Sequence, residues 1–143
     1  MALDPGKERM RLLRAYEATA YCAELPSGRV VIRVGKVCNE LDEVLLAGNF
    51  DSWAFVSAAN PQSVPLARDR NEERHRLLVR GVMQTGWPWY PGSGEPDEPG
   101  WEQEPSVLLL GVGIDAAIAL GRQFGQRAIV FGRYRTAAAL VWC

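Results

Sequence analysis

The stretch EPSVLLLGVGIDAAIALGRQFGQRAIVF, residues 104–131, carries the strongest pattern in the sequence. Residues 107–110 are all apolar, as expected of a strand buried on both faces. Small and apolar residues then recur at helical spacing, and residues 128–131 form a second apolar run. Asp115 is placed to cap the helix and Gly125 to end it. The stretch therefore predicts a strand, a helix and a second strand, around which the rest of the domain is arranged.

Gly111, Gly113 and Ala116 also match the spacing of a dinucleotide-binding turn, in which a pyrophosphate lies at a helix N-terminus. That turn normally opens its domain, whereas here only about 30 residues follow, too few for the remaining units of such a fold. Arg133 and Arg135 stand where an acid would hold the ribose. A tight turn between a strand and a helix needs glycines in any case, so we predict no cofactor.

The composition describes an ordinary globular protein. With 143 residues, 48% hydrophobic and 23% charged, the chain can bury one core without disulfides or metals. The net charge of -1 gives no general basic surface for nucleic acid, although a local patch stays possible. The three cysteines are widely spaced, so we expect free thiols. Together with the single histidine they provide no metal-ligand set. No signal peptide or membrane span is predicted, so we expect a soluble, cytoplasmic protein.

The remaining patterns complete a single α+β domain. Turn residues 26–28 separate two apolar runs in a hairpin pattern, and Asn60-Pro61 ends a buried run. We predict a mixed sheet of about five or six strands with three or four helices, over residues 15–143, after an N-terminal helical extension 1–14. The predicted helices are 7–20, 40–47 (with Asn39 as cap and Gly48 as end), 67–85 and the one after Asp115; the predicted strands are 21–25, 29–34, 52–59, 107–110, 128–131 and 137–142.

The helix over 67–85 has one side whose character changes along its length. Leu78 and Val82 belong to its apolar C-terminal half, whereas Asn71, Arg74 and His75 precede them on the same side. Such a side lines a pocket if its first turns face the domain. Alternatively, the helix extends past the sheet and its first turns are solvated.

Polar residues also cluster where predicted strands begin and end. Asn60 follows one strand, and Glu104 and Ser106 begin another. Asn60 can serve its own turn, and Glu104 can be a solvated carboxylate. If they meet Asn71 and Arg74, they form a mixed pocket for a polar ligand, to which Gln126 and Arg122 are weaker additions.

An enzyme is the second possibility. His75 and Glu104 are weak catalytic candidates, as a base and the acid that orients it. Ser57 and Ser106 lack the glycine pattern of a serine nucleophile. We predict no metal site.

A third possibility lies in residues 87–103, which contain four prolines and three tryptophans and are predicted to form a loop with a short edge strand near Trp89. Trp87, Trp89, Tyr90 and Trp101 can form a lid, a stacking surface beside Arg133 and Arg135, or a partner surface. They can equally cover the core.

Six sequence blocks in order resemble an uncharacterised bacterial family, the domain of unknown function 3293. The blocks are AYEATAY from Ala15, WAFVSAANP at 53–61, N-x-x-R-H at 71–75, EPSVLLLGVG at 104–113, FGQRAIVFG at 124–132 and the closing ALVW. The resemblance implies the domain limits but no activity. Its shared polar positions coincide with Asn60, Asn71, Arg74, Glu104 and Gln126.

We therefore expect a domain that binds a small polar or anionic ligand, such as a nucleotide. Arg74 would meet the anion, Asn60, Asn71, Glu104, Ser106 and Gln126 would complete the site, and the Trp-rich loop would cover it. The alternatives are a hydrolase-like enzyme using His75 and Glu104, and a protein or nucleic-acid interaction module using residues 87–101.

Overall fold

The structure of the protein, a computed structural model, describes residues 4–143. These residues form helices α1 (Pro5–Glu17), α2 (Asn39–Gly48), α3 (Arg68–Met83) and α4 (Ile114–Gln123), with a 3-10 helix η1 (Pro61–Ser63). The strands are β1 (Thr19–Leu25), β2 (Gly28–Ile32), β3 (Ser52–Ser57), β4 (Trp89–Pro96), β5 (Glu104–Leu110), β6 (Ala128–Arg133) and β7 (Ala139–Trp142). The α+β class is confirmed. The first three residues of the predicted extension 1–14 lie outside the described residues.

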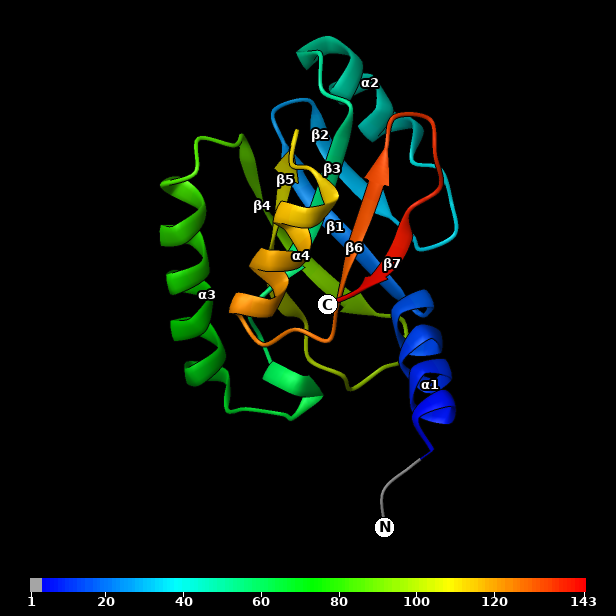
Figure 1. Cartoon of the computed structure of the whole chain (residues 1–143), viewed down its shortest axis with the longest axis vertical. Coiled ribbons are helices and arrows are strands. Elements are labelled where there is room, and N and C mark those ends of the chain that lie inside the picture. Colours follow the sequence, from blue (N-terminus) through cyan, green and yellow to red (C-terminus); the bar gives the residue numbers. More distant parts are fainter. Residues whose placement is uncertain (1–3) are drawn as a thin grey trace.

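The strands form one sheet in the order β2-β1-β4-β5-β3-β6-β7, with more strands than the five or six predicted. Within residues 4–143 each pair of neighbouring strands is antiparallel, so the sheet is not the mixed one expected. A parallel bridge between Val34 and Ala138 joins the regions next to the two edges. The sheet therefore curls until its edge regions touch (Figure 1).

The predicted strand–helix–strand unit is present as β5, α4 and β6, but its two strands are not neighbours. β3 lies between them and pairs antiparallel with both, Ala54 facing Leu109 on one side and Phe131 on the other. This arrangement brings the end of β3 next to the beginnings of β5 and β6. It is the feature that positions the candidate site.

The curl divides the core into two packed layers. α3 and α4 cover the outer face of β3, β5 and β6 through Leu78, Val82, Ala117 and Leu120, and Figure 1 shows both helices on that side. The inner layer lies inside the curl, where Leu41 and Leu45 of α2 pack against side chains from most of the strands. The inner members besides those of α2 are Tyr21, Ala23, Leu25, Val30, Ile32, Cys38, Trp53, Phe55, Leu108, Leu110, Val130 and Ala138.

The prediction of a loop with a short edge strand over residues 87–103 is wrong for β4, which lies inside the sheet between β1 and β5. The prolines of this segment are typical of a loop, which is why the sequence did not predict an interior strand. Pro91 pairs with β5 but precedes the part paired with β1, and Pro96 pairs with β1 but follows the part paired with β5. Each proline thus lies where one neighbour is missing, so the absent N–H costs no ladder bond there. Gly92 is needed because a Cβ there would come within 2.8 Å of the Cys22 carbonyl oxygen and of Phe55.

Several predicted helix ends also need correction. α1 ends at Glu17 and Thr19 begins β1, so the helix does not reach residue 20. Asn39 is the first residue of α2, after Cys38, and not its cap. Asn49, with φ 58°, takes the left-handed position after α2 in place of Gly48. α4 starts at Ile114 after Gly113, which puts Asp115 in its first turn rather than at its cap. Gly125 has φ 71°, as expected for the residue that ends this helix. None of the helices within residues 4–143 is long and apolar enough to cross a membrane.

Candidate functional site

Five of the predicted site residues meet at one end of the sheet. The residues are Asn60 after β3, Asn71 and Arg74 in the first turns of α3, Glu104 at the start of β5, and Gln126 before β6. We call them the Asn60 network. They converge because β3 ends where β5 and β6 begin, and because α3 starts beside the same end of the sheet. The proximity that the sequence could only suggest is therefore real.

Asn60 is the centre of this network. Its side-chain Nδ2 donates to Glu104 Oε1 at 2.8 Å, and its Oδ1 accepts from Asn71 Nδ2 at 2.8 Å and from the Leu66 N–H at 2.9 Å. Its own N–H donates to Asn71 Oδ1 at 2.9 Å. Both side-chain ends of Asn60 thus bond within the chain, and Asn71 is buried behind it.

Arg74 and Gln126 bind backbone carbonyl groups in the same region. Arg74 Nε donates to the Ala58 carbonyl and its Nη2 to the Phe124 carbonyl, both at 2.6 Å. Gln126 Nε2 donates to the Ala59 carbonyl at 3.0 Å. The guanidinium predicted to meet an anion therefore joins the end of β3 to the end of α4.

The turn that follows β3 is strained. Asn60, Gln62 and Ser63 all have positive φ, at 47°, 55° and 60°. A left-handed conformation costs a residue other than glycine roughly 1 kcal/mol or more, so several bonds are needed to hold the turn. Gln62 supplies two of them, since its N–H and its Nε2 both donate to the Gly125 carbonyl, at 2.8 and 2.9 Å. The network thus maintains an unfavourable backbone shape at a fixed place.

Glu104 is the acid of the network. Burial raises its pKa, and the hydrogen bond from Asn60 partly offsets that rise. Its charge in turn contributes to the raised pKa of Tyr16, which burial raises most. Ser106 is buried and donates to the Glu104 carbonyl at 3.2 Å, so its hydroxyl serves the backbone.

The proposed acid–base pair is not formed in the structure. Glu104 accepts its hydrogen bond from Asn60, whereas the buried Nδ1 of His75 has no partner within the described residues. Burial alone lowers the pKa of His75. The positions of these two side chains therefore do not support the enzyme hypothesis.

The aromatic residues of the predicted loop do not share one surface. Trp87 and Trp89 pack against the outer core layer and Tyr90 against the inner one. Trp101 lies beyond the far end of β4, is 66% exposed, and donates from Nε1 to Glu98 at 3.0 Å. Strand formation at 89–96 separates residues that the sequence presents as one cluster.

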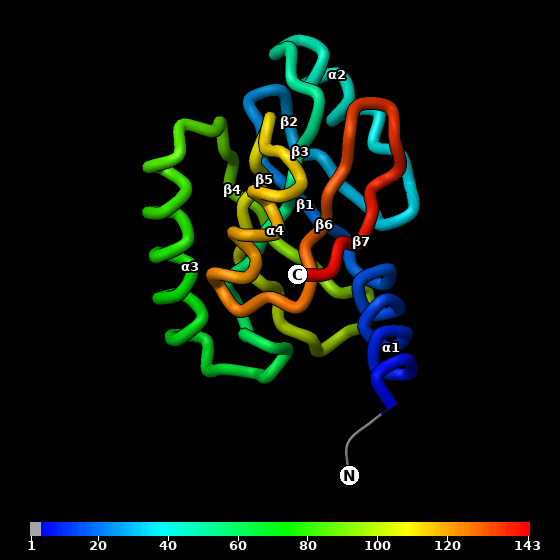
Figure 2. Tube along the Cα trace, viewed as in Figure 1, coloured from blue at the N-terminus to red at the C-terminus, as the bar shows by residue number. Residues whose placement is uncertain are grey.

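Beside the network lies a groove that sequence reasoning missed, between α1 and the end of the sheet that carries β7. We call it the α1 groove; its volume is about 330 Å³. Its lining comprises Pro5, Glu8, Arg9, Leu12, Gln62, Arg122, Gln126, Arg127, Trp142 and Cys143. In Figure 2 the blue α1 passes close to the red end of β7. Gln62 and Gln126 connect this groove to the Asn60 network.

Three arginines give the groove its charge. Arg127 pairs with Glu8, and the guanidinium of Arg9 lies 5.3 Å from the ring centroid of Trp142. Neither Arg9 nor Arg122 has a carboxylate partner within residues 4–143. Burial raises the pKa of the Cys143 thiol, against the effect of the Arg122 charge. Of these residues the sequence had indicated only Arg122 and Gln126, because nothing local relates α1 to the last strands.

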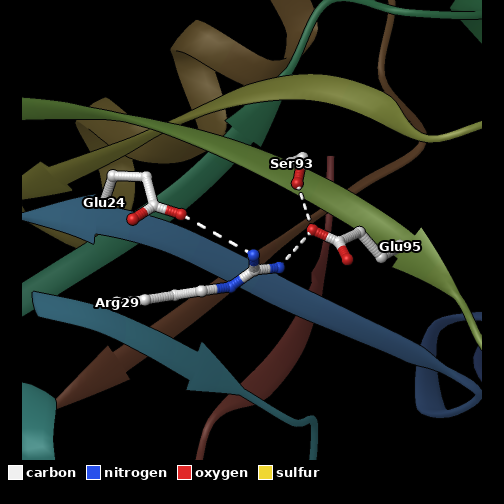
Figure 3. Close-up of polar contacts among 4 residues, drawn as sticks. All are labelled: Glu24, Arg29, Ser93 and Glu95. Carbon is white, nitrogen blue, oxygen red and sulfur yellow. Dashed lines mark hydrogen bonds and ion pairs between the residues drawn. The ribbon is translucent and has the colours of Figure 1, made fainter.

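A second polar cluster lies across β2, β1 and β4. Arg29 Nη2 is 2.6 Å from Glu95 Oε2, which also accepts from Ser93 at 2.6 Å, and Arg29 Nη1 is 3.8 Å from Glu24 (Figure 3). We call these four residues the sheet ion pairs. One guanidinium faces two carboxylates there, so the cluster has a net negative charge and offers no free cation to an anionic ligand. No cluster of three or more potential metal ligands occurs in the described part of the chain.

The comparison with protein families now identifies the region around the site. A family model described as "Protein of unknown function (DUF3293)" matches residues 56–129. The chain belongs to this family. The DUF3293 match runs from β3 to β6 and contains the whole Asn60 network. It is narrower than the resemblance from Ala15, because it leaves out α1, β1, β2, α2 and β7. Searches of curated proteins and of solved structures gave no match.

Proposed function

We propose that the protein binds a small anionic ligand in the α1 groove. The observation that carries the proposal is the convergence of Arg9, Arg122 and Arg127 on one hollow, in which Glu8 is the one acidic side chain among the described lining residues. Guanidinium groups match carboxylates and phosphates through paired, charge-assisted hydrogen bonds. A volume of about 330 Å³ suits a ligand of modest size, such as a phosphorylated metabolite or a nucleotide.

In this proposal the Asn60 network positions the groove, and Gln126 is its one member in the lining. Arg74 bonds to Ala58 and Phe124 and leaves the direct contacts to the groove arginines. The strained turn places Gln62 in the lining, and the bond to Ala59 places Gln126 there. The three free cysteines support a site of action in a reducing cytoplasm.

A thermal-shift screen tests the proposal. The purified protein is heated with inorganic phosphate, nucleotides, sugar phosphates or amino acids, each at high concentration. A ligand present at 100 times its Kd stabilises the native state by about 2.7 kcal/mol, which raises the unfolding temperature measurably. Phosphorylated compounds are expected to raise it more than neutral ones.

Arg122→Gln should abolish the shift, because it removes a groove charge that pairs with no carboxylate among residues 4–143. Arg80→Gln is the matched control, since Arg80 is an exposed arginine on α3 outside the groove. Absence of a shift with every anion, or an equal shift in Arg122→Gln and the native protein, would refute the proposal.

A further inference from the structure

The one acid among the described residues that line the α1 groove is held by one of its three arginines. Glu8 belongs to α1, whereas Arg127 directly precedes β6, and the two side chains are 33% and 32% exposed. A pair with this exposure is accessible to solvent and exchanges its partners readily. An anion that enters the groove therefore meets a competitor already bound to Arg127.

α1 is attached differently at its two ends. The helix, which the structure describes in full, buries none of its residues. Near its C-terminal end the ring of Tyr16 stacks on that of Tyr21, with 6.2 Å between the ring centroids, and the Tyr16 hydroxyl donates to the Ala128 carbonyl at 3.4 Å. Its N-terminal half is held by the Glu8–Arg127 pair and by Arg9 over Trp142. Both of those contacts use groove arginines, so a ligand that recruits the arginines weakens them.

We infer that Glu8 is a built-in competitor for the anion. Anion binding to Arg127 and Arg122 displaces Glu8 and releases the N-terminal turns of α1, and Arg9 leaves the groove with them. The inference rests on the proposed function. It assigns two roles: Glu8 lowers the affinity of the groove for anions, and α1 converts occupancy of the groove into movement of a helix. Tyr16 stays in place and acts as the fixed end of that movement.

The test compares the native protein with Glu8→Gln and with Glu17→Gln. Glu17 is an exposed acid at the other end of α1 and does not line the groove, so its replacement removes the same charge from the same helix. Inorganic phosphate is the probe. Its affinity is measured by NMR titration of the arginine Nε–H signals, and α1 mobility by amide hydrogen exchange of residues 5–17.

Glu8→Gln should bind phosphate about two- to fivefold more tightly than the native protein, as expected on removal of an exposed ion pair that competes with it. Phosphate should speed exchange in the first turns of α1 in the native protein and in Glu17→Gln. In Glu8→Gln the exchange should already be fast and should change little on binding.

Two results would overturn the inference while leaving the proposed function intact. One is equal phosphate affinity in Glu8→Gln and the native protein. The other is slower exchange of α1 on phosphate binding, which would mean that the helix closes over the ligand. If phosphate and the other anions of the screen bind to none of the three proteins, the proposed function fails, and the competitor role of Glu8 fails with it.

Discussion

The Asn60 network and the sheet ion pairs both join residues that are far apart in sequence, yet they differ in burial and in what they bind. The network consists of hydrogen bonds between partly or fully buried groups, and four of these bonds involve Asn60. Its Arg74 and Gln126 side chains donate to backbone carbonyl groups. The sheet ion pairs connect side chains to one another, with Arg29 48% and Glu24 62% exposed. Side chains that bond to the backbone fix where the chain goes. Exposed side chains that bond to one another leave the backbone unchanged, because the β ladders already define it.

The same contrast separates the network from the α1 groove. Arg74 donates to two carbonyl oxygens, whereas Arg9 and Arg122 face the groove without a carboxylate partner in the described chain. An arginine that donates to backbone carbonyl groups serves structure, and one that faces a hollow remains free for a ligand. Identical residue types therefore have different roles, which only their surroundings determine.

The largest effect is expected from Asn60. Asn60→Gly removes all side-chain bonds of the residue, leaves Glu104 and the Leu66 N–H without a partner, and should lower the free energy of unfolding by about 2–4 kcal/mol. Asn60→Ala should cost about 1 kcal/mol more, because alanine tolerates the positive φ of 47° less well than glycine. Urea unfolding measures both variants. Losses below about 1 kcal/mol for both would show that the network does not hold the turn.

Glu104→Gln tests the acid of the network through pH. Burial raises the folded-state pKa of Glu104 above its unfolded value, so the folded protein binds the proton more tightly. Ionisation of Glu104 therefore destabilises the fold as pH rises through that interval, and the cost is absent below the unfolded pKa. The substituted glutamine side chain keeps an acceptor for Asn60 and never ionises.

Glu104→Gln should accordingly be more stable than the native protein at neutral pH, and the difference should disappear in acid. Thermal unfolding of both proteins from pH 7 down to about pH 4 measures this. The difference in stability between the two proteins cancels the separate effect of buried His75, which is the same in both. A stability difference that grows toward low pH would contradict the burial argument.

The smallest effect is expected from the sheet ion pairs. Arg29→Gln should leave the unfolding temperature close to that of the native protein in physiological salt, since exposed pairs contribute little and are screened. A double-mutant cycle with Glu95→Gln isolates the pair from other effects of the two substitutions. A destabilisation as large as that of Asn60→Gly would remove the distinction between the two clusters.

The sequence by itself determined the local elements and the importance of the polar positions at strand ends. Runs of apolar residues and helical spacing depend on near neighbours, so β3, β5, α3, α4 and β6 were predicted at nearly their observed places. The turn at Asn60 and the helix end at Gly125 are likewise readable, because proline restricts the backbone and glycine permits the left-handed conformation that ends a helix.

Tertiary structure alone decided the order of strands and the position of the groove. No local signal places β3 between β5 and β6, or makes an interior strand of the Gly- and Pro-rich β4, because strand pairing depends on contacts distant in sequence. Glu8 and Arg127 are separated by 119 residues, yet they meet at one edge of the α1 groove. This pair forms because α1 packs against the last strands. Packing between elements distant in sequence leaves no periodic pattern of residues from which it could be predicted.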